Sequence, residues 1–228
     1  KVHKPNPRQY TATIPALPNV LILFQRAWDI ATSVASGDVD LGITGYDTFM
    51  ETVNGGRNGI VINLAAMRLF HFKKEGSLID VSTYPVGVGM PERPTPMGKM
   101  YISRKKHRPT WYVPASIAAD HRKKGDPLPP SVPPGPDNPL GEHALYLSRL
   151  TYLIHGTNKP ASVGLRATNG CIRLYPEDVV RLFENTPVKT PVKIVNQPYL
   201  AGQSDGIVYM ETHTPFEESG KAKWKKVY

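Results

Sequence analysis

The pattern of hydrophobic and polar positions changes character near residue 55. Residues 28–34 carry apolar side chains at helical spacing, which predicts a helix. Residues 39–45 predict a short buried strand that runs into a glycine turn. A cluster of turn-forming residues follows at 54–59. We therefore expect a small α/β segment over residues 1–55 and a separate domain after it.

Beyond this cluster, short apolar runs recur at regular intervals and predict strands. They lie at residues 60–64, 67–72, 78–88, 99–104, 145–147, 191–196 and 207–210. Strands this short and this regularly spaced favour a β-sandwich or a barrel-like domain. One helix is expected after Pro176, because proline and acidic residues suit the first turn of a helix. The chain is thus predicted to be mainly β, with a β-sandwich domain over residues 56–199 and a C-terminal extension over 200–228.

Residues 107–142 are rich in proline and could form a disordered linker. Trp111 and Tyr112 are too apolar for a simple spacer, and residues 116–124 could form a short helix. Long loops inside a compact domain are usually functional. We interpret this segment as an ordered loop that borders an active-site cleft.

Composition narrows the classes of protein to which the chain can belong. No apolar run approaches the length of a membrane span, and the first residues do not resemble a signal peptide. The single cysteine excludes an internal disulfide and a cysteine-based metal site. The histidines at 107, 121 and 143 fit no metal-ligand spacing, so no metal is expected.

The formal net charge of +9 has two interpretations. Basic proteins often bind nucleic acid, but the lysines here are mostly scattered and do not alternate with aromatic residues. Attraction to an anionic polymer is equally compatible with the charge. We therefore expect no nucleic-acid partner.

The candidate chemistry is concentrated between His155 and Leu174. Cys171 is the only cysteine, and it follows Gly170 at the start of an apolar-alternating run. Backbone N–H groups at such a turn can face a developing oxyanion. His155 could take the thiol proton if the fold brings the two side chains within about 3 Å. By itself such a pair is weak evidence, because a lone cysteine is often a small buried hydrophobic residue.

The longer motif is more specific. The strings HGTN at 155–158 and TNGCIRL at 168–174 resemble the active-site signature of L,D-transpeptidase catalytic domains of the YkuD type. TPMGKMYI at 95–102 and GPDNPLG at 135–141 resemble segments of the ErfK/YbiS group in that family. The resemblance covers about residues 57–228 and implies a β-sandwich catalytic domain with a short helix after the catalytic cysteine.

The resemblance also implies a role for each residue of the motif. Cys171 is expected to be the nucleophile, His155 its base, and Gly156 the residue whose carbonyl orients the imidazole. The oxyanion hole is expected to consist of the backbone N–H groups of Asn169, Gly170 and Cys171. For substrate binding we expect Arg173, which would hold a carboxylate, together with Trp111 and Tyr112 of the loop.

The reaction implied by the resemblance is acyl transfer on peptidoglycan stem peptides without a cofactor. Cys171 would release D-alanine from a tetrapeptide stem, and a second stem, a lipoprotein lysine or water would capture the thioester. Carbapenems are the expected inhibitors, and the periplasm or cell envelope is the expected location. Many relatives carry serine and histidine where this chain has Thr168 and Asn169.

Residues 1–55 resemble a different family. The strings at 7–19, 24–31 and 36–48 are similar to part of ATP phosphoribosyltransferase. No loop for phosphoribosyl pyrophosphate follows residue 55, so we do not expect transferase activity of that kind. A protein derived from this phosphoribosyltransferase and a non-catalytic wall-binding module remain as alternatives.

Overall fold

The computed structural model describes residues 11–14, 17–23, 58–76, 78–204 and 207–214. The chain divides into two compact units, one of residues 1–56 with 199–212 and one of residues 57–198 with 213–228. The helix predicted at 28–34 and the strand predicted at 39–45 lie outside the described residues. The predicted division of the chain into domains stays a prediction.

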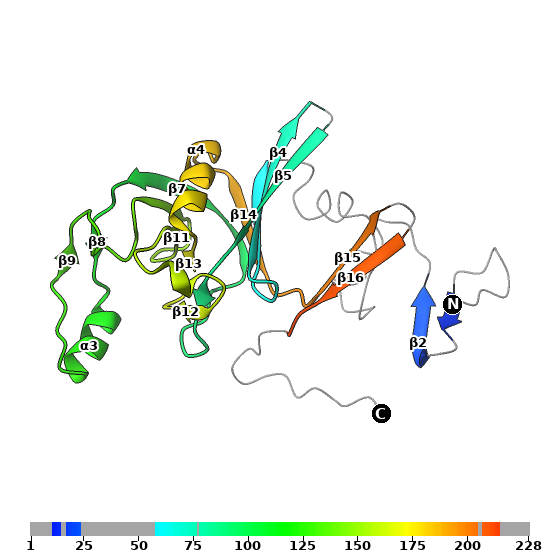
Figure 1. The fold of residues 1–228 in the computed structure, drawn as a ribbon, viewed down its shortest axis with the longest axis horizontal. Coiled ribbons are helices and arrows are strands. Elements are labelled where there is room, and N and C mark those ends of the chain that lie inside the picture. The colour runs from blue at the N-terminus through cyan, green and yellow to red at the C-terminus, as the bar shows by residue number, and fades with distance from the viewer. Residues whose placement is uncertain (1–10, 15–16, 24–57, 77, 205–206, 215–228) are drawn as a thin grey trace. The chain divides into compact units, whose positions relative to one another are not determined.

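The second unit is built on an eight-stranded mixed sheet (Figure 1). Across the sheet the strands are β13 (Ile172–Arg173), β11 (Leu153–His155), β10 (His143–Leu147), β7 (Gly98–His107), β14 (Pro191–Val195), β3 (Gly59–Asn63), β4 (Arg68–Glu75) and β5 (Leu78–Pro85). The pairs β11–β13 and β14–β3 are parallel, and the other neighbours are antiparallel. The strands β3 and β14 lie far apart in the sequence but pair with each other. The sheet therefore brings together the early and late parts of this unit.

The core follows from the alternation of side chains along these strands. On β7, Met100 and Ile102 are buried while Lys99 and Tyr101 are exposed, as the two faces of a half-buried strand require. Ile60 and Ile62 of the central strand β3 are fully buried in the same core. Complete burial of one such aliphatic side chain stabilises the fold by roughly 1.5–3 kcal/mol. The predicted mainly β class is confirmed.

Two α-helices accompany the sheet in the described part of the chain. The helix α4 (Pro176–Asn185) begins with the proline and two acidic residues that predicted it, and it buries Val179 and Leu182. The helix α3 (Ala115–Lys123) lies in the long segment between β7 and β10 and has no buried residue. The expected helix after the cysteine is therefore present.

Short elements complete the described residues. A parallel pair joins β6 (Val88–Gly89) to β12 (Arg166–Thr168), and an antiparallel pair joins β8 (Trp111–Tyr112) to β9 (Ser131–Val132). A 3-10 helix, η1, spans Pro160–Ser162. The first unit contains the hairpins β1 (Thr11–Ile14) with β2 (Leu17–Leu23) and β15 (Tyr199–Ser204) with β16 (Ile207–Thr212). Of these, β16 matches the strand expected at 207–210, and Val88 of β6 lies in the run expected at 78–88.

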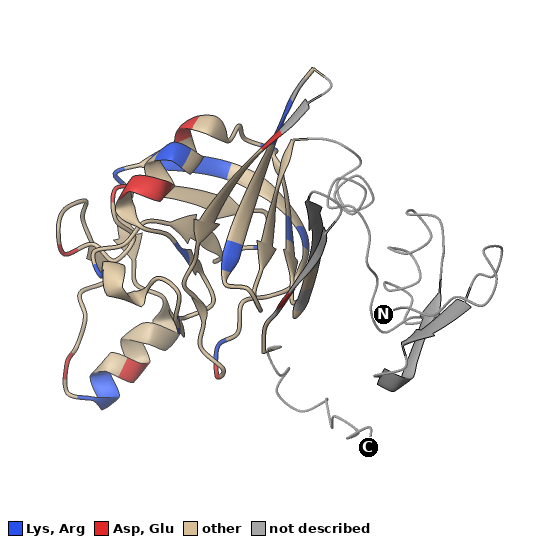
Figure 2. Cartoon of the chain, turned by 45° about the vertical axis from the view of Figure 1, so that its right-hand side comes forward, with Lys and Arg blue, Asp and Glu red and all other residues tan. Residues whose placement is uncertain are grey.

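The two α-helices of the described residues carry charged side chains of both signs. Basic and acidic side chains occur side by side on both α3 and α4 (Figure 2). Within the ranges that the structure describes, no helix is both long enough and apolar enough to cross a bilayer.

Candidate active site

The sheet places the predicted nucleophile and base on neighbouring strands. In the parallel pair β11–β13, Ile154 lies opposite Ile172 and His155 lies opposite Arg173. Cys171 immediately precedes β13, two residues before Arg173. Side chains two residues apart in extended chain point to the same face, and so do residues opposite each other in register. Cys171, Arg173 and His155 therefore share one face at the edge of the sheet, with Cys171 and His155 in diagonal positions.

The imidazole of His155 is held in one orientation. Its Nδ1–H donates to the carbonyl oxygen of Gly156 at 2.6 Å, and the side chain is almost fully buried. With the proton on Nδ1, the other ring nitrogen of the neutral imidazole carries a lone pair and can accept a proton. A side chain at Gly156 would crowd the site, because a Cβ there would lie 3.0 Å from Cγ1 of Val179. The expected contact between Gly156 and the histidine is thus present.

Burial controls the protonation of both groups. Burial, reinforced by the charge of Arg173, lowers the pKa of His155 to about 4, although the carbonyls of Gly156 and Leu140 oppose this effect. Burial raises the pKa of the Cys171 thiol above its ordinary value, against smaller opposing effects of the Leu153 backbone and Arg173. The resting site at neutral pH therefore holds a neutral thiol and a neutral imidazole rather than a thiolate–imidazolium pair.

The thiol itself faces a loop that precedes β11. Sγ of Cys171 donates to the carbonyl oxygen of Thr151 at 3.7 Å. Thr151 has a φ of 74°, which is unusual for a β-branched residue. Such backbone strain is maintained only when the surrounding structure determines it. The loop thus gives the resting thiol an acceptor other than the imidazole.

The turn before Cys171 is fixed by Thr168. Its Oγ1 donates to the carbonyl oxygen of Cys171 at 2.6 Å and accepts the Gly170 N–H at 3.1 Å. Gly170 has a φ of 103°, and a Cβ there would lie 2.8 Å from Cε1 of Tyr152. Of the three amides expected in the oxyanion hole, the one of Gly170 is therefore engaged within the turn. Asn169 also uses its side chain, whose Oδ1 accepts Nη1–H of Arg93 at 2.7 Å.

Arg173 is anchored through both its backbone and its side chain. Its N–H and carbonyl oxygen bond with Gly87 at 2.9 and 2.8 Å. Its Nη1–H donates to Oγ of Ser162 at 2.8 Å. The Nε–H of the same guanidinium is buried and finds no acceptor in the described part of the chain. An unsatisfied charged donor beside the thiol is suited to an anionic group of a ligand.

The two aromatic residues of the loop lie on β8. Trp111 is half-buried and Tyr112 is 76% exposed. They are paired with Val132 and Ser131 of β9. Both strands and α3 belong to the segment 108–142 between β7 and β10, called the excursion below. Their role in substrate binding stays a prediction.

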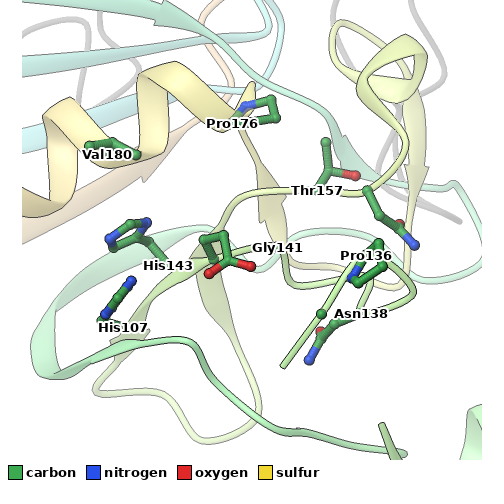
Figure 3. A pocket seen from close by; sticks show the side chains of 11 residues that line it. His107, Pro136, Asn138, Gly141, His143, Thr157, Pro176 and Val180 are labelled. Carbon is green, nitrogen blue, oxygen red and sulfur yellow. The ribbon is translucent and has the colours of Figure 1, made fainter. Parts of the chain in front are cut away.

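A cavity of about 360 Å³ lies next to the site without including it (Figure 3). Pro176 and Val180 of α4 line it on one side, with His107 and His143 of the sheet and the turn at Pro136 and Asn138 on others. Two of the lining residues adjoin Gly156: Thr157 follows it in the sequence, and Gly141 lies against its backbone. Cys171, His155 and Arg173 do not line this cavity. In the described ranges no three His, Cys, Asp or Glu side chains gather as metal ligands.

Sequence reasoning missed several residues that support the site. They are Arg93, Thr151, Tyr152, Ser162 and Thr168. Thr168 had a detectable signal, because a threonine two residues before a glycine commonly bonds to the backbone of a turn. The others reach the site from separate loops through tertiary contacts, and nothing in the local sequence marks them.

Comparisons with known proteins agree with the motif. Residues 57–194 match the YkuD family, described as the L,D-transpeptidase catalytic domain. The chain is 42% identical over 188 residues to the Probable L,D-transpeptidase YbiS of Escherichia coli K12, covering 82% of this chain and 60% of that protein. It is 41% identical over 165 residues to the Probable L,D-transpeptidase ErfK/SrfK of the same organism, covering 72% of this chain and 52% of that protein. The chain thus spans between about half and three fifths of these relatives.

Among solved structures, the Ldtfm–avibactam carbamoyl enzyme matches with a TM-score of 0.47 and 20% sequence identity. The match covers 61% of this chain and 49% of that one. The family match begins at residue 57, so the resemblance of residues 1–55 to ATP phosphoribosyltransferase stays a prediction.

Proposed function

Because the chain belongs to the YkuD family of L,D-transpeptidase catalytic domains, we propose that it transfers acyl groups between peptidoglycan stem peptides. The donor is a tetrapeptide stem that ends in diaminopimelate and D-alanine. The observation that carries the proposal is the common face of Cys171, His155 and Arg173, with the imidazole oriented by Gly156.

In the first step, Sγ of Cys171 attacks the carbonyl carbon of the diaminopimelate residue. The thiol proton passes to Nε2 of His155, because Nδ1 already carries the proton donated to Gly156. The carbon–nitrogen bond to D-alanine then breaks, and His155 returns the proton to the departing amine. The product of this step is a thioester on Cys171.

The negative charge on the attacked carbonyl oxygen needs backbone N–H donors nearby. They are sought in the turn of residues 168–171, which is called the nucleophile turn below. The N–H groups of Asn169 and Cys171 are the available candidates, whereas the Gly170 N–H must first leave Thr168 Oγ1. Arg173 binds a carboxylate of the donor stem, supported by its buried and unsatisfied Nε–H. Trp111 and Tyr112 contact the stem from the long excursion.

In the second step, an acceptor amine attacks the thioester. His155 takes a proton from that amine and returns it to the departing thiolate, which restores the resting site. A second stem gives a diaminopimelate–diaminopimelate cross-link, a lipoprotein lysine gives an attached lipoprotein, and water gives hydrolysis. Because peptidoglycan lies in the cell envelope, the proposal implies that the protein acts in the periplasm or cell envelope.

Product analysis tests the proposal directly. The protein is incubated with a disaccharide tetrapeptide, and released D-alanine and dimeric products are measured by mass spectrometry. We expect D-alanine release together with a dimer one D-alanine lighter than two donors. Release without a dimer would leave hydrolysis as the reaction, and absence of both products with the wild-type protein would contradict the proposal.

A further inference from the structure

The excursion over residues 108–142 has a rigid base. It starts and ends at neighbouring positions, since His107 and His143 are opposite each other and the Arg108 N–H donates to the Glu142 carbonyl at 2.7 Å. Asn138, fully buried, donates Nδ2–H to the Pro109 carbonyl at 2.8 Å and accepts the Leu140 N–H at 2.9 Å. The position of the excursion is therefore tied to the sheet at its base.

The side chain of Arg93 links the helix α3 of the excursion to the turn before Cys171. Arg93 donates Nη1–H to Oδ1 of Asn169 at 2.7 Å, two residues before the nucleophile. Its Nη2–H donates to the carboxylate of Asp120 on α3. One guanidinium thus bridges two segments that are 49 residues apart in the sequence (169 − 120).

The loop that carries Arg93 is fastened to the same turn. The Met90 N–H donates to the Thr168 carbonyl at 2.9 Å, and the Arg93 N–H donates to the Met90 carbonyl at 3.0 Å. A planar guanidinium with several donors in a fixed geometry suits this bridging role, whereas an ammonium group does not. Arg93 is therefore held at its backbone beside the turn and reaches outward to α3.

We propose that Arg93 is a positioning residue that couples α3 to the nucleophile turn. Through Asn169 it fixes the turn that presents Cys171, and through Asp120 it makes that turn sensitive to the position of the excursion. A stem peptide that settles against the excursion thereby acts on the nucleophile. The kinetic part of this inference rests on the proposed function, and the structural coupling does not.

An isolated ion pair on the surface would have little effect. Arg93 and Asp120 have side chains 29% and 43% exposed, and pairs of this kind change equilibria by only about two- to five-fold. The distinguishing property is therefore non-additivity. If the contacts are coupled, removing the side chain of Asn169 or of Asp120 has the same effect as removing that of Arg93. If the two contacts are independent, the effects of the two removals multiply.

The first experiment measures hydrogen exchange over α3 and does not depend on catalysis. The variants are Arg93→Ala, Asn169→Ala and the control Arg122→Ala, an exposed arginine of the same helix. We expect Asn169→Ala, which does not contact α3 directly, to speed exchange in α3 by about two- to five-fold, as Arg93→Ala does. Exchange in Asn169→Ala that equals the wild-type rate would overturn the coupling.

The second experiment measures acylation of Cys171 by a carbapenem in Asp120→Asn, Asn169→Ala and their double variant. We expect Asp120→Asn to slow acylation by about two- to five-fold although Asp120 lies outside the reacting groups, with Arg122→Ala unchanged. The double variant should match Arg93→Ala rather than the product of the single effects, and Arg93→Lys should not restore the rate. Multiplicative effects, or no effect of Asp120→Asn, would overturn the inference. A wild-type protein that is not acylated contradicts the proposed function alone, because the exchange experiment still decides the coupling.

Discussion

At the scale of single residues, the site depends on keeping two ionisable groups neutral. His155 is buried, and its pKa of about 4 leaves the imidazole free to accept a proton at neutral pH. The raised pKa of Cys171 means that the thiol keeps its proton until a base removes it. The proposed chemistry is therefore general-base catalysis, in which proton transfer accompanies the attack. A preformed thiolate is not required.

This arrangement predicts a particular pH dependence of acylation by a carbapenem. The base is lost only when pH falls through the folded pKa of His155, so the acid limb should have its midpoint near 4. The rate should change little between about pH 5 and pH 8. Stopped-flow measurement of acylation over this range checks it, with circular dichroism at each pH to exclude unfolding. An acid limb near the ordinary histidine value of 6.5 would show that the imidazole is not shielded as described.

At the scale of elements, the site depends on two short strands and the turn between β12 and β13. β12 has three residues and β13 has two, so alternation of apolar and polar side chains does not define either strand. The sequence motif, rather than this periodicity, indicates the region. Gly170 has a φ of 103°, which favours glycine, and a Cβ there would lie against the ring of Tyr152. Cys171 is thus positioned by local backbone geometry as well as by the sheet.

Replacement of Gly170 tests this positioning against a matched control. Gly164 also has a positive φ, of 80°, but a Cβ there would have nothing within 4 Å. Gly164→Ala should cost only the backbone strain, about 1–2 kcal/mol of stability. Gly170→Ala adds overpacking against Tyr152, about 1–3 kcal/mol more, and should also slow acylation. Urea unfolding and acylation rates measure the two effects; equal effects of both changes would mean that Tyr152 does not confine the turn.

Some of these elements could be predicted from the sequence and others could not. The strands over 60–64, 67–72 and 99–104 and the helix after Pro176 were predictable because each has a clear period or a helix-start signal. The roles of Arg93 and Ser162 were not predictable. Arg93 bonds to Asn169, 76 residues away, and Ser162 bonds to Arg173, 11 residues away, and only the tertiary fold determines these contacts. Residues 107–142 were predicted to form an ordered loop, and the buried Asn138, bonded to the Pro109 carbonyl, is a physical reason for such order. The position of this loop at an active-site cleft stays a prediction.

At the scale of the whole molecule, the residues of the candidate site lie in one of the two compact units. Cys171, His155, Arg173 and the excursion all belong to the unit of residues 57–198 with 213–228. The family match covers 57–194 and so lies within the same unit. We therefore predict that residues 1–54 are dispensable for catalysis.

A truncated protein that begins at Gly55 tests this division. Its site retains every described contact of Cys171, His155 and Arg173, so acylation by a carbapenem should stay within about three-fold of the full chain. Urea unfolding of both proteins provides the control for folding. A truncated protein that folds cooperatively but is not acylated would show that the N-terminal residues contribute to the site, and the predicted boundary would be wrong.

The central claim is that Cys171 forms a covalent acyl-enzyme, and intact-protein mass spectrometry tests it most directly. The wild-type protein, Cys171→Ala and His155→Ala are each incubated with a carbapenem at neutral pH. We predict a single adduct on the wild-type protein, no adduct on Cys171→Ala, and an adduct that forms about 100-fold more slowly on His155→Ala, as loss of a general base requires. An adduct of equal yield on Cys171→Ala, or a wild-type protein that remains unmodified, would contradict the account.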